Sequence, residues 1–245
     1  MDVIEYNFEV NGFDVAARYD RAFLDETVVP LIRRFAGMRQ KAGRGIVVFL
    51  AAPPAAGKST LAQLFMTLSS GIVPLQALGM DGFHYHQSYL ESHEIVRAGE
   101  TIPLYKVKGG PESFDVAKLN DKLRRFISGE RIKWPFYDRR LHDVVEDAIE
   151  VDAEIAFVEG NWLLLKDDIW KETSKLCDYS ITLTAPGDML RDRLISRKMK
   201  GGATKDEAHR HYEFNDEPNI RRFLSDSARG DLVLTMDASG AISMQ

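Results

Sequence analysis

Apolar positions along the chain change their period several times, and these changes divide it into expected strands and helices. Residues 4–15 alternate apolar and polar side chains about Asn11-Gly12, which is typical of a β-hairpin because Asn-Gly readily takes the positive φ angles of a type I′ turn. Residues 20–40 carry apolar side chains near helical spacing. Pro30 is expected to kink or divide this helix unless it falls in a first turn.

From residue 46 onward, short apolar segments alternate with helical patterns. Residues 46–50 are apolar throughout, as expected of a strand buried on both faces. Further strands are expected at 72–80, 154–160, 178–184 and 231–236. Helices are expected at 58–69 and at 114–127, where Gly129 stops the second. Strands separated by helices imply right-handed crossovers, so the sequence predicts an α/β fold with a mostly parallel sheet.

Composition adds a domain count and a broad class to this picture. A chain of 245 residues with 44% hydrophobic and 28% charged residues fits one globular domain with a substantial core. We expect a single domain over 1–245, with 1–43 as an N-terminal hairpin and helix appendage and 44–245 as the main body. The net charge of -5 gives no reason to expect a nucleic acid partner. Neither a leader nor a membrane span is expected, and the lone Cys177 suits a cytoplasmic location.

The stretch "FLAAPPAAGKST" at 49–60 resembles a phosphate-binding loop with some of its glycines replaced. The pattern G-x-x-x-x-G-K-[ST] is met in its second half by Gly57, Lys58 and Ser59. Ala52 takes the first glycine position, and Ala55 takes another that is often glycine. Alanine at a positive φ angle costs roughly 1 kcal/mol, which a loop between a buried strand and a helix tolerates. We therefore expect a working loop.

Backbone N–H groups of such a loop and of the following helix N-terminus bind phosphates, helped by the helix dipole. The expected nucleotide-binding residues are Ala55, Ala56, Gly57, Lys58, Ser59 and Thr60. Lys58 supplies a mobile charge for the phosphates, and Ser59 is by position a ligand of Mg²⁺. Pro53-Pro54 removes two donors but stiffens the loop.

Two acids follow expected strands at the edge where parallel sheets carry their active sites. Asp81 in "GMDGFHYH" is either a base for a substrate hydroxyl or a simple turn residue, since Asp-Gly is a common turn dipeptide. Glu159 in "IAFVEG" has the position of a carboxylate that acts on Mg²⁺, directly or through water, although strands often end in a surface acid. The His84-Tyr85-His86 triplet lacks further metal ligands nearby, so substrate contact or loop packing is favoured over zinc.

Several motifs, taken in their order along roughly residues 45–236, resemble those of one protein family. They are "APPAAGKST", "MDGF", "KGGPESFD", "PFYDRRLHDVV", "VEGNWLLL" and "NDEPN". Together they resemble the phosphoribulokinase, uridine kinase and type I pantothenate kinase family of P-loop kinases, nearest to bacterial fructose-transport-associated or uridine-kinase-like kinases. The resemblance implies a three-layer P-loop fold with helices on both faces and a helical lid around 187–202. It also implies use of ATP and Mg²⁺.

The resemblance assigns roles at the phosphate end of the site. Asp81 corresponds to the catalytic base, Lys58 to the loop lysine, Ser59 to the Mg²⁺ ligand and Glu159 to the second acidic residue. The resemblance also suggests a homodimer.

It assigns further roles around the substrate and the lid. Tyr137 and His142 fall in a substrate-contacting segment, and His84 follows the base in the D-G-F-H pattern. Arg193 and Arg197 resemble lid arginines, whose guanidinium groups suit the charge on phosphoryl oxygens. For these two arginines a solvated helix face is the alternative.

The substrate is less well defined. Gly109 stands where uridine kinases carry an aspartate for the ribose, which argues against a nucleoside. The insert between "DGF" and "KGGPESFD" does not match the pantothenate pocket. A sugar such as fructose is therefore favoured over pantothenate or uridine. No N-K-x-D motif supports a GTPase. An inactive nucleotide-binding module is the rival from another class, although the retained acids and lysine weigh against it.

Overall fold

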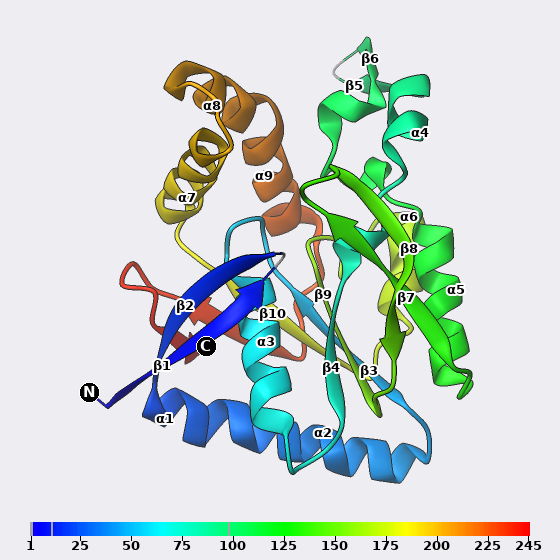
Figure 1. Cartoon of the computed structure of the whole chain (residues 1–245), viewed down its shortest axis with the longest axis vertical. Helices are drawn as coiled ribbons and strands as arrows, with labels where there is room; N and C mark the ends of the chain where they lie inside the picture. Colours follow the sequence, from blue (N-terminus) through cyan, green and yellow to red (C-terminus); the bar gives the residue numbers. More distant parts are fainter. Residues whose placement is uncertain (1, 11, 98) are drawn as a thin grey trace.

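A central six-stranded sheet organises the chain, for which the computed structural model describes residues 2–10, 12–97 and 99–245 (Figure 1). Its strands, in spatial order, are β12 (Ile242–Met244), β11 (Leu232–Met236), β10 (Tyr179–Thr184), β3 (Ile46–Ala51), β9 (Ile155–Gly160) and β4 (Leu75–Gly79). All neighbours pair in parallel except β12, which is antiparallel to β11. The mostly parallel sheet predicted from sequence is confirmed.

Strand β3 explains the layering because its residues alternate between two separate apolar cores. Ile46, Val48 and Leu50 belong to the core on one face of the sheet. Val47 and Phe49 belong to the core on the other face. A strand buried on both faces reads as a continuous apolar run, which is why this one was recognisable.

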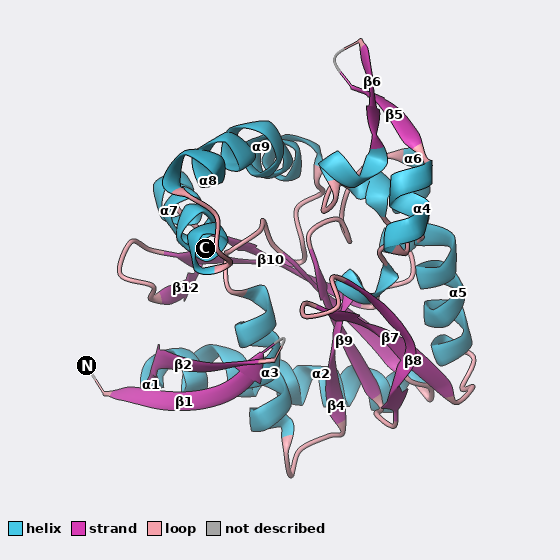
Figure 2. Ribbon diagram, turned by 45° about the horizontal axis from the view of Figure 1, so that its top comes forward, coloured by secondary structure: helices cyan, strands magenta, loops and turns pink. Residues whose placement is uncertain are grey.

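Helices cover both faces of the sheet and complete three layers (Figure 2). The first core is covered by α2 (Val29–Ala42) and α3 (Lys58–Ser69). The second core is covered by α5 (Val116–Ile127) and α6 (Asp168–Ser174). Helix α5 begins where Asp115 accepts a hydrogen bond from the Lys118 N–H at 2.9 Å, a standard N-cap.

The N-terminal segment follows the predicted hairpin and helix. Strands β1 (Val3–Val10) and β2 (Phe13–Asp20) pair antiparallel, while the predicted Asn11 turn position lies outside the described residues. The helix after them divides into α1 (Arg21–Phe23), a π-helical turn at 24–28 and α2. Pro30 lies in the first turn of α2, where its missing N–H costs little.

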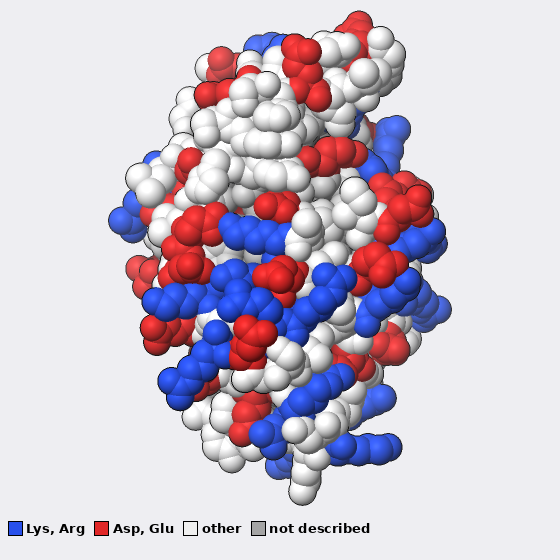
Figure 3. All heavy atoms as spheres, turned by 90° about the vertical axis from the view of Figure 1, so that its right-hand side faces the viewer, with Lys and Arg blue, Asp and Glu red and all other residues white. Residues whose placement is uncertain are grey.

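The elements that were not predicted from the sequence include a helix and two hairpins between β4 and β9. They are α4 (Gln87–Ser92), the hairpin β5 (Glu94–Arg97) with β6 (Glu100–Pro103), and the hairpin β7 (Ile132–Asp138) with β8 (Asp143–Val151). Strand β8 is mostly exposed and is tied to α5 by ion pairs such as Lys122 to Asp147 at 2.8 Å. On this face of the molecule basic and acidic side chains are interleaved, without a continuous basic expanse (Figure 3).

A helical arm rises beside the sheet edge at the C-terminal side of the strands (Figure 1). It consists of α7 (Gly187–Lys200), α8 (Lys205–His211) and α9 (Glu217–Asp226). Helix α7 occupies the segment predicted as the lid. Across the described residues, no helix combines the length and the apolar character needed to cross a membrane.

Candidate active site

The phosphate loop connects β3 to α3, as its sequence context predicted. Gly57 is the N-cap of α3 with φ of 87°, a left-handed value that glycine adopts without strain. Ala55 also has a positive φ, of 63°, so the cost expected for alanine applies at this position. Ala52 is not among the residues with positive φ, and it is fully buried with its N–H donating to the Gly160 carbonyl at 3.3 Å. Glycine is therefore needed less at Ala52 than the motif suggests.

The first turn of α3 presents backbone donors at this loop. Helix N-termini leave their first N–H groups without partners inside the helix, and those groups suit phosphate. The Ala56 N–H donates instead to the Pro53 carbonyl at 3.3 Å, which closes the turn that precedes Gly57. The donors at Lys58, Ser59 and Thr60 thus carry most of the expected phosphate binding.

Ser59 and Glu159 form a close oxygen pair below the loop. The Ser59 hydroxyl donates to Glu159 Oε1 at 2.6 Å, and Glu159 is 8% exposed. Burial, together with the charge of Asp81, raises the pKa of Glu159, against the lowering effects of Lys58 and the Ser59 hydrogen bond. A hydroxyl and a carboxylate side by side are the hard oxygen ligands that Mg²⁺ prefers, so these residues fit the expected metal.

Asp81 lies at the same sheet edge, in a short 3₁₀ turn at 80–83 directly after β4. Strand β4 pairs with β9 so that Gly79 faces Glu159, which places both acids together. Gly82 lies so close to β7 that a Cβ on it would be 2.1 Å from the Pro135 carbonyl oxygen. A side chain at this position would therefore displace the turn that carries Asp81.

Cations surround the Asp81 carboxylate. Burial alone would raise the pKa of Asp81, but its interaction with the adjacent His84 and the charges of Lys58, Arg139 and Arg197 outweigh it and lower the pKa below its ordinary value. Arg139 Nη2 lies 3.9 Å from Asp81 Oδ2. Asp81 is therefore ionised at neutral pH, as a proton acceptor must be.

Arg139 was not among the residues singled out in the sequence. It lies in the turn between β7 and β8, which crosses above the sheet edge. The segment "YDRRLH" was recognised as part of the substrate region, but nothing local distinguishes Arg139 from Arg140. Only the tertiary position beside Asp81 separates them.

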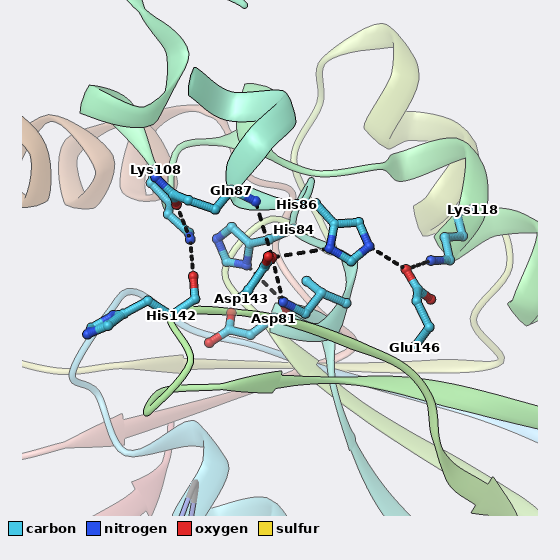
Figure 4. A network of polar contacts seen from close by, with 10 residues as sticks. Asp81, His84, His86, Gln87, Lys108, Lys118, His142, Asp143 and Glu146 are labelled. Carbon is cyan, nitrogen blue, oxygen red and sulfur yellow. Dashed lines mark hydrogen bonds and ion pairs between the residues drawn. The ribbon is translucent and has the colours of Figure 1, made fainter. Parts of the chain in front are cut away.

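His84 lies beside Asp81 (Figure 4), and its ring packs near that of Tyr137. Their ring centroids are 5.2 Å apart, and the His84 ring also packs on Phe114 at 3.9 Å. Burial lowers the pKa of His84, so the imidazole is neutral, and its Nδ1–H donates to the Asp81 carbonyl at 2.8 Å. Burial raises the pKa of Tyr137 to about 12. Both predicted substrate residues are therefore uncharged polar groups, and Tyr137 lines the cavity that contains Asp81.

His142 is placed differently. Its side chain is exposed, its φ is 53°, and Figure 4 draws the ring directed away from Asp81 and His84. Its backbone carbonyl accepts a hydrogen bond from Lys108 Nζ at 2.9 Å. Lys108 also donates to Gln87 Oε1 at 2.9 Å and lies over the Tyr137 ring at 4.9 Å. The structure thus brings Lys108, which was not predicted, closer to the site than the His142 ring.

The second histidine of the triplet joins a separate network (Figure 4). His86 contacts Asp143 through Nδ1 and Glu146 through Nε2, both at 3.2 Å. Glu146 also pairs with Lys118 of α5. His86 therefore holds β8 against α4 and α5, whereas His84 contacts Asp81, Phe114 and Tyr137.

The two lid arginines lie on α7 above the phosphate loop. Arg193 Nη1 donates to the Ala55 carbonyl at 3.1 Å, which joins the lid to the loop. The Arg197 side chain is exposed, and its charge helps to hold down the pKa of Asp81 against burial. Arg193 thus contacts the phosphate loop, and Arg197 is close enough to Asp81 to affect its pKa.

A cavity of about 190 Å³ connects these groups. Its polar lining includes Ser59, Asp81, Tyr137, Arg139 and Glu159. The acids and the loop hydroxyl therefore face one shared space, in which a phosphate donor and a small hydroxyl compound could meet.

The known proteins to which this chain is similar include named kinases. The uncharacterized protein YggC of Escherichia coli is 42% identical over 235 residues, which cover 94% of this chain and 95% of YggC. A crystal structure of a candidate fructose transport system kinase from Silicibacter sp. TM1040 matches with a TM-score of 0.75 and 29% identity, covering 84% of this chain and 98% of that one. A pantothenate kinase of Limosilactobacillus reuteri is 26% identical over 216 residues, covering 77% of this chain and 67% of the kinase.

The phosphate loop, the paired acids and helix α7 all lie within the part of the chain that a family of small-metabolite kinases shares. The model of that family matches residues 47–234. By this match the chain belongs to the phosphoribulokinase/uridine kinase family.

Proposed function

We propose that the protein transfers the γ-phosphoryl group of ATP to a hydroxyl of a sugar, with fructose as the favoured acceptor. The proposal of phosphoryl transfer rests on the Asp81 carboxylate, which Lys58, Arg139 and other cations hold ionised beside the Ser59–Glu159 pair. An ionised carboxylate among cations accepts a proton from an alcohol while the same cations stabilise phosphoryl oxygens.

In the proposed step the acceptor oxygen bonds to the γ-phosphorus as the bond from that phosphorus to the β–γ bridging oxygen breaks. The hydroxyl proton passes to Asp81, and ADP leaves with the bridging oxygen. Lys58 and the lid arginines Arg193 and Arg197 bind the phosphates. Ser59 and Glu159 would hold Mg²⁺, which when bound neutralises charge on the phosphate oxygens.

His84 and Tyr137 serve as neutral polar groups for the acceptor. With Nδ1–H committed to the Asp81 carbonyl, the neutral His84 ring leaves Nε2 as a hydrogen-bond acceptor. Tyr137 keeps its proton at neutral pH because its pKa is about 12. Neutral donors and acceptors suit the hydroxyl groups of an uncharged polyol.

Two observations favour a sugar over a nucleoside. The position of the ribose aspartate is taken by Gly109, whose carbonyl accepts from Trp162 Nε1 at 3.0 Å and which has no side chain to offer. The structurally similar protein named as a candidate fructose transport system kinase is matched over 98% of its length.

The test is ADP release measured with D-fructose, pantothenate and uridine as separate acceptors. We expect the highest kcat/KM with fructose. Asp81→Asn should lower kcat by ~10²–10⁴-fold, the usual range for a general base, with ATP affinity unchanged. Near wild-type turnover in Asp81→Asn would refute the base. Tight ATP binding without acceptor-dependent ADP release from any of the three would instead support an inactive nucleotide-binding module.

A further inference from the structure

The tip of the N-terminal hairpin reaches the cavity that contains Asp81. Glu9 and Val10 at the end of β1, and Gly12 at the start of the return, line this cavity together with the catalytic groups. The family model begins only at residue 47, so this hairpin lies outside the segment that the family shares. A wall of the candidate active site is thus supplied by a part of the chain expected to be an appendage.

The hairpin is held in place by the protein core. Phe8, next to Glu9, is 8% exposed and belongs to the same apolar core as β3 and α3. Its ring stacks on Tyr6 at 5.8 Å, and Tyr19 of β2 stacks on Phe23 at 6.2 Å. Buried aromatic anchors of this kind contribute strongly to packing, so they fix the backbone of β1 at Glu9, whose side chain is exposed.

Two hairpins distant in sequence meet over the cavity. Figures 1 and 2 show the tip of β1–β2 beside the turn of β7–β8. A Cβ placed on Gly12 would lie 3.7 Å from Nη2 of Arg140 in that turn. The neighbouring Arg139 faces Asp81, so one turn contacts both the hairpin and the carboxylate. The cavity is therefore bounded by both hairpins.

We propose that Glu9 and Val10 form a specificity-determining wall of the acceptor site. The Glu9 carboxylate accepts hydrogen bonds from hydroxyl groups of a polyol other than the one that is phosphorylated, and Val10 limits the length of the acceptor. A carboxylate at this position also repels an anionic acceptor such as pantothenate. The inference rests on the proposed function, because it names which acceptor hydroxyls the same site recognises.

The test compares steady-state constants of the full chain with D-fructose as acceptor. Glu9→Gln should raise the KM for fructose by ~10-fold, as expected for losing a hydrogen bond to a charged group, with kcat and the KM for ATP within about twofold. Glu5→Gln is the matched control, since Glu5 lies on the same strand and pairs with Arg18 at 2.8 Å on the surface. It should leave all constants unchanged.

Val10→Trp provides a second, steric probe. It should raise the KM for fructose while the KM for ATP stays the same, and its melting temperature shows whether the hairpin still packs. Pantothenate turnover should improve relative to fructose in Glu9→Gln, because a like charge is removed. Unchanged fructose KM in both folded variants, with active wild-type protein, would overturn this inference alone. If the wild-type protein phosphorylates none of fructose, pantothenate and uridine, both the proposed function and this inference are overturned.

Discussion

Replacing Arg139 by glutamine should shift the acid limb of the pH profile toward higher pH. Burial raises the pKa of Asp81, and Arg139 is one of the cations that hold this pKa down against it. A carboxylate with a lowered pKa stays active until the pH falls through that low value. Without Arg139 the pKa of Asp81 rises, so activity is lost at a higher pH as the solution is acidified.

The size of this shift follows from the geometry. Arg139 Nη2 and Asp81 Oδ2 are 3.9 Å apart, and their side chains are 33% and 38% exposed. Two unit charges near this distance attract by about 1 kcal/mol in water and about 4 kcal/mol at an effective dielectric constant of about 20. The solvent exposure favours the lower value. Since one pKa unit corresponds to ~1.4 kcal/mol, we expect a shift of about one unit.

The measurement is kcat/KM for the acceptor at saturating ATP, followed from neutral pH down to the lowest pH at which the protein stays folded. Circular dichroism at each pH shows that the protein stays folded. Arg140→Gln is the control, because it removes the same charge one residue away, where the guanidinium faces Gly12. An acid limb that does not move in Arg139→Gln, or that moves equally in both variants, would refute the reasoning.

Two further predictions concern the acid beside Ser59 and the alanines of the loop. Burial raises the pKa of Glu159, so the folded state binds its proton more tightly than the unfolded state, and stability is lost as pH rises through the folded pKa. Glu159→Gln should therefore raise the melting temperature of the metal-free protein at neutral pH but not in strong acid, while kcat falls by ~100-fold or more. Ala55→Gly relieves a φ of 63° and should stabilise by up to ~1 kcal/mol in urea denaturation. Ala52→Gly should cost about 0.8 kcal/mol, because it only removes a fully buried methyl group.

Elements whose apolar side chains recur with a regular period could be predicted from the sequence. Helix α3 has the bounds expected from its apolar pattern, and strand β3 ends one residue later than expected, because the residues that each element buries lie within a single segment of sequence. The hairpin β7–β8 was missed for the opposite reason. Strand β8 is mostly exposed, and its pairing with β7 and its ion pairs to α5 are tertiary contacts that leave no apolar period.

The residues of the candidate site likewise divide into those that the sequence predicts and those that it does not. Lys58, Ser59, Asp81 and Glu159 could be named because motif and strand end coincide. Arg139 and Glu9 could not, because their roles depend on which distant segment lies opposite. The alternating pattern of β1 predicts a strand, but only the packing of Phe8 places its end over the cavity.

Asp81 and Glu159 illustrate how one sheet edge assigns two acids to different tasks. Gly79 pairs with Glu159 across β4 and β9, so Glu159 is still inside its strand and is buried, whereas Asp81 lies beyond the end of β4 among cations. Their pKa values consequently move in opposite directions, upward for Glu159 and downward for Asp81. Two acids whose surroundings shift their pKa values in opposite directions are suited to different chemical roles. Asp81 is ionised because protein cations surround it, which suits the proposed transfer of a proton from a hydroxyl, while burial makes the charge on Glu159 costly unless a further cation such as Mg²⁺ lies beside it, which suits the proposed metal ligand.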